Sequence, residues 1–165
     1  MIKQKLENEV IEFLQHSNYI EGEYSKRGLE DAKKAWLYAV ENRYNFTVDY
    51  ILEIHKILMK RLRPDIAGKV RDCAVYIGWQ LKPKIPEKEL IKKLDGWIKS
   101  CAPNKKATYE TIKKQHVTFE RLHPFTDGNG RVGRILMNIH CINAELPIIV
   151  IHEGEEQYEY YKLFR

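Results

Sequence analysis

The chain has 165 residues, of which 44% are hydrophobic and 31% charged, and its formal net charge is +5. These values are typical of a globular protein with a buried core and exclude a disordered or low-complexity polypeptide. No apolar run approaches the roughly 20 residues of a membrane span, and the first residues do not resemble a signal peptide.

The basic residues and the cysteines indicate which partners and which cellular compartment to expect. The lysines are spread along the chain, so we expect a solvated surface, with no nucleic-acid groove and no membrane association. Cys73, Cys101 and Cys141 are odd in number, widely spaced and without a CxxC pattern. Such cysteines are typical of reduced thiols, and we therefore expect a cytoplasmic protein.

Hydrophobic periodicity predicts three helices in the first part of the chain. The first spans about residues 10–20, and Gly22 is placed to end it. The second spans about residues 29–43. The third begins near Thr47 and ends before Pro64, because the residue before a proline disfavours the helical conformation.

The pattern then changes at residues 70–78, which are short, β-branched and aromatic-rich and predict a small hairpin. Pro86 suits the first position of a fourth helix that continues to Ile98. Further helices are predicted at about 108–122, 131–146 and 158–164. No repeat or linker divides the chain, so we expect one all-α domain over residues 1–165, with one small β-hairpin.

Two residues of the stretch HPFTDGNGRVGR, which runs from His123 to Arg134, have side chains suited to catalysis. His123 has the side chain whose ordinary pKa lies closest to neutral, so it can accept a proton at physiological pH. Asp127 supplies a hard carboxylate oxygen, which suits Mg²⁺ shared with phosphate oxygens.

The rest of this stretch suits a bound polyphosphate. Gly128, Asn129 and Gly130 can turn successive backbone N–H groups toward one point at the start of a helix, where anions bind favourably. Arg131 and Arg134 lie three residues apart and share one helical face, and their planar guanidinium groups match phosphate oxygens.

The stretch resembles the motif H-P-F-x-[D/E]-G-N-G-R-x-x-R of the Fic (filamentation induced by cAMP) family, and every specified position is filled. The resemblance extends over about residues 47–150 and implies a Fic-type helical bundle. It also implies that a hairpin near residues 73–78 is a flap, on which Val75, Tyr76, Ile77 and Gly78 hold an extended target segment by strand addition. From the residues alone, a purely structural hairpin is an equally good interpretation.

The resemblance implies a protein adenylyltransferase that moves AMP from ATP to a Ser, Thr or Tyr hydroxyl of a target protein. In this reading His123 takes the hydroxyl proton and Asp127 holds Mg²⁺. The resemblance assigns phosphate binding to Gly128, Asn129, Gly130, Arg131 and Arg134, with the γ-phosphate on Arg134. Self-modification and homo-oligomer formation are compatible with this activity.

A second and shorter motif lies at residues 17–22, within a predicted inhibitory helix at about 10–24. Ser17, Glu21 and Gly22 resemble the Fic inhibitory motif [S/T]-x-x-x-E-[G/N] in its class II, N-terminal position. The resemblance implies that Glu21 pairs bidentately with Arg134 and takes the donors that would bind the γ-phosphate. The alternative is an ordinary helix that ends at a glycine.

Two other functions remain open at this point. In some Fic proteins the inhibitory glutamate orients a water that hydrolyses the modified side chain, so the chain could be a deAMPylase or a bifunctional enzyme. It could also be a non-catalytic nucleotide-binding regulator, or a toxin controlled by a partner. The retention of His123 and Asp127 argues against an inactive binder.

Overall fold

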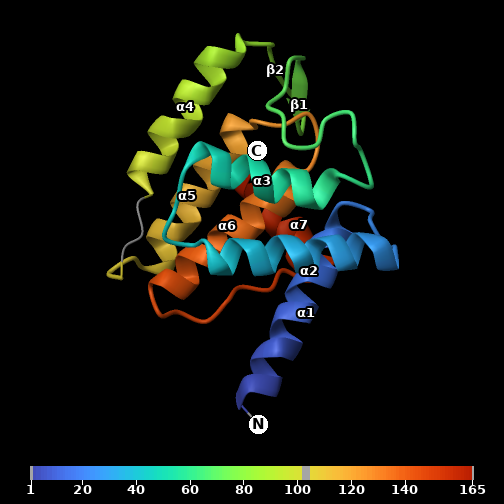
Figure 1. The fold of residues 1–165 in the computed structure, drawn as a ribbon, viewed down its shortest axis with the longest axis vertical. Coiled ribbons are helices and arrows are strands. Elements are labelled where there is room, and N and C mark those ends of the chain that lie inside the picture. The colour runs from blue at the N-terminus through green and yellow to red at the C-terminus, as the bar shows by residue number, and fades with distance from the viewer. Residues whose placement is uncertain (1, 102–104, 165) are drawn as a thin grey trace.

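The computed structural model describes residues 2–101 and 105–164, with side chains from residue 7 onward. Within these residues the chain forms seven helices, a two-stranded hairpin and a short 3-10 turn (Figure 1). The all-α bundle with one hairpin is therefore confirmed. The elements are α1 (Ile2–Ile20), α2 (Lys26–Glu41), α3 (Val48–Met59), β1 (Val75–Ile77), β2 (Gln80–Lys82), α4 (Glu87–Ser100), α5 (Tyr109–Leu122), α6 (Asn129–Asn143), α7 (Glu155–Tyr161) and the turn Lys162–Phe164.

Side-chain caps fix where several helices begin. Ser25, Thr47 and Thr108 precede α2, α3 and α5, and each hydroxyl accepts a hydrogen bond from the backbone N–H three residues later. Such caps satisfy one of the N–H groups that a helix leaves without an internal partner. Pro86 was expected as the first residue of its helix, but it precedes α4 as the N-cap. The first helix begins eight residues earlier than predicted, at Ile2 instead of about residue 10.

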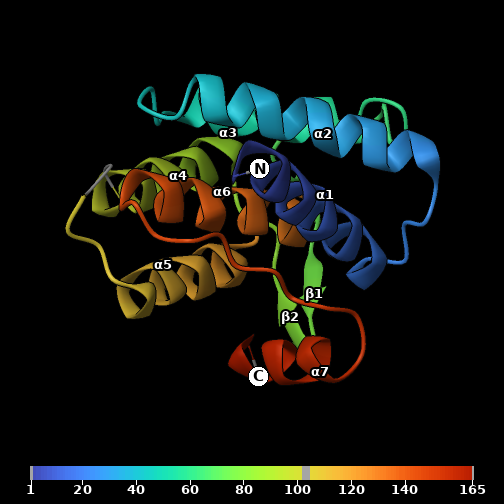
Figure 2. The ribbon, with the colours of Figure 1, turned by 90° about the horizontal axis from the view of Figure 1, so that it is seen from below.

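Helix α6 lies at the centre of the bundle and contacts α1, α2, α3 and α5 (Figure 2). Almost every residue of α6 is buried, so both of its faces contribute to the core. Each fully buried Ile or Leu side chain contributes roughly 1.5–3 kcal/mol of hydrophobic free energy. The core therefore holds α6 firmly in place. Because the HPFTDGNGR segment leads directly into α6, its position is fixed as well. The core around it includes Phe13, Leu14, Trp36, Ile51, Ile54, Leu58, Phe119, Val132, Ile135, Leu136 and Ile139.

The hairpin is longer than predicted. Its strands pair antiparallel with Val75 opposite Lys82 and Ile77 opposite Gln80, so the flap predicted near residues 73–78 contains only the first strand and the turn. Gln80–Lys82 is short and mostly polar, and its strand conformation comes from pairing with β1 and not from its own pattern. Figure 2 shows the hairpin beside α7, on the side of the bundle opposite α2 and α3.

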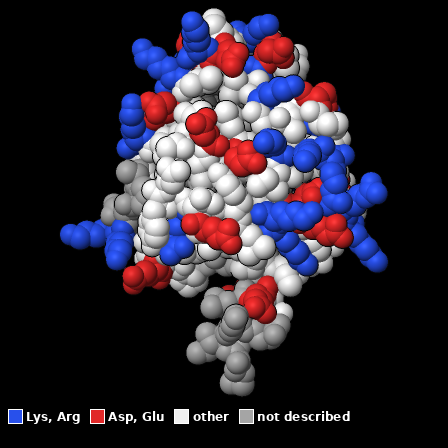
Figure 3. Space-filling view, in the orientation of Figure 1, with Lys and Arg blue, Asp and Glu red and all other residues white. Residues whose placement is uncertain are grey.

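None of the described helices is long and apolar enough to cross a membrane. On the face drawn in Figure 3, basic side chains gather toward the upper and right edges, with acidic side chains among them. Mixed charge of this kind is typical of a solvated surface.

Candidate active site

A cavity of about 330 Å³ joins the three groups of residues that the sequence singled out. This volume is in the range of small-molecule sites in proteins. The end of α1, the hairpin, the end of α5, the start of α6 and the C-terminal turn all contribute to its walls. The lining residues are Glu21, Tyr76, Ile77, Gly78, Glu120, His123, Gly130, Arg134, Tyr160, Tyr161 and Phe164.

His123 caps the C-terminus of α5 in a left-handed conformation, with φ of 50° and ψ of 63°. This conformation is costly for a residue other than glycine and is often found at functional sites. Its Nδ1 lies 3.0 Å from the carbonyl oxygen of Glu120. A carbonyl oxygen only accepts, so Nδ1 carries the proton of the neutral ring and Nε2 keeps a free lone pair.

The surroundings of His123 also favour its neutral form. Burial lowers the pKa of His123 below 6.5, although its hydrogen bond to the backbone of Glu120 opposes this shift. The positive charge of Arg71 lowers the pKa further. A neutral imidazole with an accessible Nε2 is the form that accepts a proton.

The loop after His123 is held in place by aromatic and amide contacts. Phe125 is fully buried and stacks on His55, with ring centroids 3.8 Å apart and planes 4° apart. His55 accepts from the N–H of Gly68 at Nδ1, over 2.9 Å, so its Nε2 donates to the carbonyl of Asp127, also over 2.9 Å. The loop therefore enters α6 in a fixed position.

The side chain of Asn129 belongs to this scaffold. Its Oδ1 accepts from the N–H of Phe125 over 2.9 Å and its Nδ2 donates to the carbonyl of Phe125 over 2.8 Å. The Asn129 Oδ1 and one N–H of its Nδ2 are therefore engaged by the loop backbone. Its backbone N–H and the second N–H of Nδ2 remain available for the phosphate role that the resemblance implies.

The start of α6 fits a polyphosphate. Gly128 has φ of 84°, which favours glycine, and its N–H bonds to Asp127 Oδ1 over 2.7 Å. The first helical hydrogen bond is donated by Val132 to Gly128, so the N–H groups of Asn129, Gly130 and Arg131 have no acceptor within the helix. In addition, the buried Nε of Arg131 has no hydrogen-bond partner among the described residues. An anion at this helix end would satisfy these donors.

Asp127 fits a hard divalent cation beside that anion. Its side chain is 47% exposed, and its Oδ1 lies 3.5 Å from Nη2 of Arg131. The carboxylate therefore lies at the surface next to the helix terminus, where Mg²⁺ could share oxygens of a phosphate and of water.

Arg134 is only 1% exposed and is tied to the end of α1. Its Nε donates to Ser17 Oγ over 2.9 Å, and its Nη2 donates to the Ser17 carbonyl over 2.9 Å and to Glu21 Oε1 over 2.7 Å. The pair with Glu21 was expected to be bidentate. Instead Glu21 contacts a single guanidinium nitrogen, because Nε is bonded to Ser17 and Nη1 to Tyr160.

The motif of Ser17, Glu21 and Gly22 therefore lies at the helix end and not wholly within the helix. Helix α1 stops at Ile20, and Glu21 and Gly22 form the turn after it, with Gly22 at φ of 73°. A side chain at Gly130 would collide with the Glu21 carboxylate. Glu21 therefore lies against the helix terminus that suits a phosphate.

Glu120 is a cavity residue that the sequence reasoning missed. Burial raises its pKa to about 8, and its Oε1 has no hydrogen-bond partner among the described residues. It fits between α5 and α6 because Gly133 has no side chain there, since a Cβ at 133 would meet the Glu120 carboxylate. The helical glycine Gly133 was the available signal for this close approach.

A short hydrogen-bonded chain supports Arg134 from the other side. Arg134 Nη1 donates to the hydroxyl of Tyr160 over 3.3 Å, and this hydroxyl lies 2.8 Å from His116 Nε2. His116 Nδ1 lies 3.1 Å from the carbonyl of Gly133 and donates to it, so Nε2 accepts from Tyr160. The C-terminal helix thus helps to orient the guanidinium group.

Arg71 connects the hairpin to the loop, and its role was not predicted. Its side chain donates to the carbonyls of His123, Cys73 and Pro83 over 2.8 to 2.9 Å. The two ends of the hairpin segment are thereby fixed to the backbone of His123. The hairpin exposes large side chains, namely Tyr76 at 67%, Trp79 at 94% and Leu81 at 54%.

Comparisons with known proteins agree on a family. A model of the Fic/DOC family matches residues 45–141. The chain is 31% identical over 126 residues to "Protein adenylyltransferase Fic" of Nematostella vectensis, covering 74% of this chain and 29% of that protein. It is 32% identical over 117 residues to "Protein adenylyltransferase fic-1" of Caenorhabditis elegans, covering 70% and 23% respectively.

Solved structures show the same fold. A Fic domain containing signaling protein from Bacteroides thetaiotaomicron superposes with a TM-score of 0.76 at 20% identity, covering 97% of this chain and 72% of that one. Fic-1 from C. elegans superposes with a TM-score of 0.68 at 26% identity, covering 92% and 53%. The chain therefore spans roughly a quarter of the curated relatives, but more than half of these solved chains.

Proposed function

Because the chain belongs to the Fic/DOC family, we propose that it transfers AMP from ATP to a hydroxyl side chain of a target protein. One observation carries this proposal: a neutral histidine with a free Nε2 shares one cavity with a buried arginine and a helix N-terminus. This cavity offers a proton acceptor next to an anion site, which are the two requirements of nucleotidyl transfer.

His123 acts as the general base. As the target hydroxyl oxygen attacks the α-phosphorus of ATP, its proton passes to Nε2 of His123. A new P–O bond forms to the target, and the bond between the α-phosphorus and the bridging oxygen breaks, so that pyrophosphate leaves. The hydrogen bond from Nδ1 to the Glu120 carbonyl keeps the ring oriented and stabilises the positive charge that it acquires.

The start of α6 holds the phosphates. The N–H groups of Asn129, Gly130 and Arg131 bind α- and β-phosphate oxygens, and Arg131 Nε supplies a further donor. Arg134 holds the γ-phosphate. Asp127 would hold Mg²⁺, and when bound this ion neutralises phosphate charge and assists the departure of pyrophosphate.

The hairpin aligns the target. An extended segment that pairs with the edge of the flap would bring its hydroxyl toward His123, because the flap residues Tyr76, Ile77 and Gly78 line the same cavity. The bonds of Arg71 hold the hairpin and the base in register.

Glu21 inhibits transfer by competition for Arg134. With Nη2 bonded to Glu21 and Nε bonded to Ser17, the guanidinium group has fewer donors for a γ-phosphate. The carboxylate also adds negative charge at the helix terminus where the phosphates bind. ATP would then lie with its α-phosphorus out of line with the attacking oxygen, and such misalignment lowers the rate steeply.

A second candidate function is removal of AMP from the modified target. Glu21 and His123 line the same cavity, and only Oε1 of Glu21 contacts Arg134 among the described residues. The other carboxylate oxygen could orient a water toward the phosphorus and accept its proton. A His123 protonated at Nε2 would give that proton to the leaving oxygen as the bond between phosphorus and the target side chain breaks. Release of AMP from a purified modified target, dependent on Glu21, would establish this activity.

The decisive test compares the wild type, Glu21→Gly and Glu21→Gly/His123→Ala with ATP labelled at either the α- or the γ-phosphate, in a cell lysate. We expect the α-label in protein with Glu21→Gly, little with the wild type, and none with the double variant. Glu23→Gly is the matched control, since it removes a carboxylate two residues away, and it should behave as the wild type. Incorporation of the γ-label, or transfer that survives His123→Ala, would overturn the proposal.

A further inference from the structure

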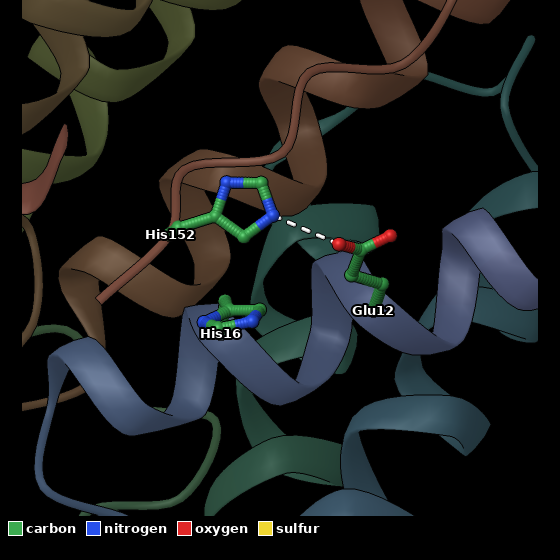
Figure 4. A group of neighbouring side chains, drawn as sticks. All are labelled: Glu12, His16 and His152. Atoms are coloured by element: carbon green, nitrogen blue, oxygen red, sulfur yellow. Dashed lines mark hydrogen bonds and ion pairs between the residues drawn. The ribbon is translucent and has the colours of Figure 1, made fainter. Parts of the chain in front are cut away.

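Three side chains outside the cavity form a compact cluster of metal-ligand types (Figure 4). Glu12 and His16 lie one turn apart on α1, and His152 lies in the segment between α6 and α7. One ligand atom from each residue lies within 4.8 Å of the other two. In sequence the histidines are 136 positions apart, so only the fold brings them together.

Two carboxylates fix the orientation of the His152 ring. Its Nδ1 lies 2.8 Å from Glu156 Oε2, and its Nε2 is directed at Glu12 Oε1, also over 2.8 Å. Histidines that bind metals in proteins commonly donate their second N–H to a carboxylate, which fixes the ring and increases its basicity. Glu156 supplies that carboxylate, and the Glu156 oxygen also accepts from the His152 backbone N–H over 2.9 Å.

Glu12 and His16 complete a set of three ligands with His152. The ring centroids of His16 and His152 are 4.6 Å apart, and the backbone N–H of Glu153 donates a hydrogen bond to His16 Nδ1 over 3.2 Å. Figure 4 shows Glu12 and His16 on the side of α1 that faces His152. Two imidazoles and one carboxylate are ligands that zinc and related ions prefer, with a fourth position left to water.

We propose that Glu12, His16 and His152 bind a divalent transition-metal ion of the zinc type, which fastens α1 to the segment before α7. Neither the Asp127 site nor the cavity contributes a ligand to it. When the ion enters between His152 and Glu12, the Nε2 proton of His152 leaves to solvent, and the 2.8 Å hydrogen bond to Glu12 is replaced by two bonds to the metal. The bond between His152 and Glu156 remains.

The ion would act on the two segments that hold Arg134. His16 directly precedes Ser17, and the segment after His152 leads into α7, which carries Tyr160, so two of the partners of Arg134 lie on the segments that the ion would join. The hydroxyl of Tyr161 also donates to the carbonyl of Ile20 over 3.3 Å. A bound ion would therefore strengthen the inhibited arrangement, a consequence that rests on the proposed function, whereas metal binding itself does not.

The test measures binding without nucleotide, using the full chain with any affinity tag removed and metal stripped by a chelator. Titration calorimetry with Zn²⁺ should show one site in the wild type, weakened at least about tenfold in His152→Gln and in Glu12→Gln. Glu156→Gln, which only removes the orienting carboxylate, should weaken it about 10- to 100-fold. Glu7→Gln, an exposed change on the same helix, and His123→Ala should bind as the wild type does.

Two further readouts separate metal binding from a simple ion pair. Zn²⁺ should raise the melting temperature of the wild type and slow amide exchange over residues 8–20, with neither effect in His152→Gln. Co²⁺ should give the visible absorption bands of a four- or five-coordinate site in the wild type. Equal Zn²⁺ affinity of the wild type and His152→Gln would overturn the proposal, as would a site that His123→Ala abolishes.

Discussion

Glu21 Oε1 lies 2.7 Å from Arg134 Nη2 and joins the end of α1 to the helix that follows the HPFTDGNGR segment. The side chain of Arg134 is 2% exposed and that of Glu21 is 27% exposed, so the contact is shielded on one side only. A charge-assisted hydrogen bond of this kind contributes about 1.5–3 kcal/mol. This is enough to hold the segment in place, yet small enough for a ligand or a conformational change to displace it.

Ser17→Ala should release transfer in part. It removes the acceptor of Arg134 Nε but keeps the bonds of Nη2 to the Ser17 carbonyl and to Glu21. We expect the initial rate of labelled AMP transfer to rise about 3- to 10-fold, less than with Glu21→Gly. Ser100→Ala deletes an equivalent hydroxyl far from the cavity and should leave the rate unchanged. A Ser17→Ala rate equal to that of the wild type would show that Glu21 alone restrains Arg134.

The rate of transfer should depend on pH through His123. Burial lowers its pKa below 6.5, so the neutral form that accepts a proton is already dominant at pH 7. With Glu21→Gly, kcat/KM should be constant above pH 7 and should fall at lower pH with a midpoint below 6.5. Circular dichroism over the same range would check that the fold is intact. A midpoint above 6.5 would contradict the buried, neutral imidazole described above.

The stability of the protein should depend on pH through Glu120. Its folded-state pKa of about 8 exceeds the ordinary 4.5, so between these values the folded state binds the extra proton and stability falls as pH rises. The buried histidines His116, His55 and His140 have the opposite effect, because burial lowers their pKa values to about 3 or 4. Each still adds about 0.4 kcal/mol between pH 6.5 and 8, as the imidazole of the unfolded chain loses its proton. We therefore expect the free energy of unfolding of the wild type to fall by about 1–2 kcal/mol relative to that of Glu120→Gln over this range.

Urea unfolding at pH 6.5 and 8 tests this expectation. Glu120→Gln is neutral at both values, so only the histidine contribution should remain in its pH dependence. Glu110→Gln, at the exposed start of the same helix, should follow the wild type. If the wild type and Glu120→Gln change equally between the two pH values, the buried carboxyl is not the group that titrates.

Trp79 should contribute to target docking. It lies at the turn of the hairpin and is 94% exposed, which is unusual for a large apolar side chain without a partner to cover it. In the Glu21→Gly background, Trp79→Ala should raise the KM for the target about tenfold and leave the KM for ATP unchanged. Tyr44→Ala is the matched control, since Tyr44 is 68% exposed but lies between α2 and α3 and not on the hairpin. An equal change in both KM values would point to a distorted site.

The sequence predicted the parts of the site that are contiguous. Residues 123–134 combine chemically informative side chains at fixed spacing, and the helical periodicity around them is strong, so the loop-to-helix turn at Gly128 followed from local patterns. Ser17 and Glu21 also form a local pair, although their contact with Arg134 depends on how α1 packs against α6.

The parts that the sequence did not predict depend on packing between distant segments. Glu120 stands between Phe119 and Arg121 in a polar pattern typical of an exposed position, and only the close approach of α5 and α6 buries it. The strand Gln80–Lys82 lacks an alternating pattern and is ordered by pairing with β1. His152 lies in a segment without regular structure, and nothing local indicates that it lies beside α1.

The burial of α6 has a consequence for genetic screens. The end of α6 to which the proposed function assigns phosphate binding and its core-forming residues belong to one continuous helix, so substitutions that abolish transfer there will often abolish folding as well. A search for loss of activity will therefore return many variants that fail to fold and are degraded in the cell. A search for gain of activity should instead favour the end of α1, where a change can loosen the restraint on Arg134 and leave the centre of the bundle intact.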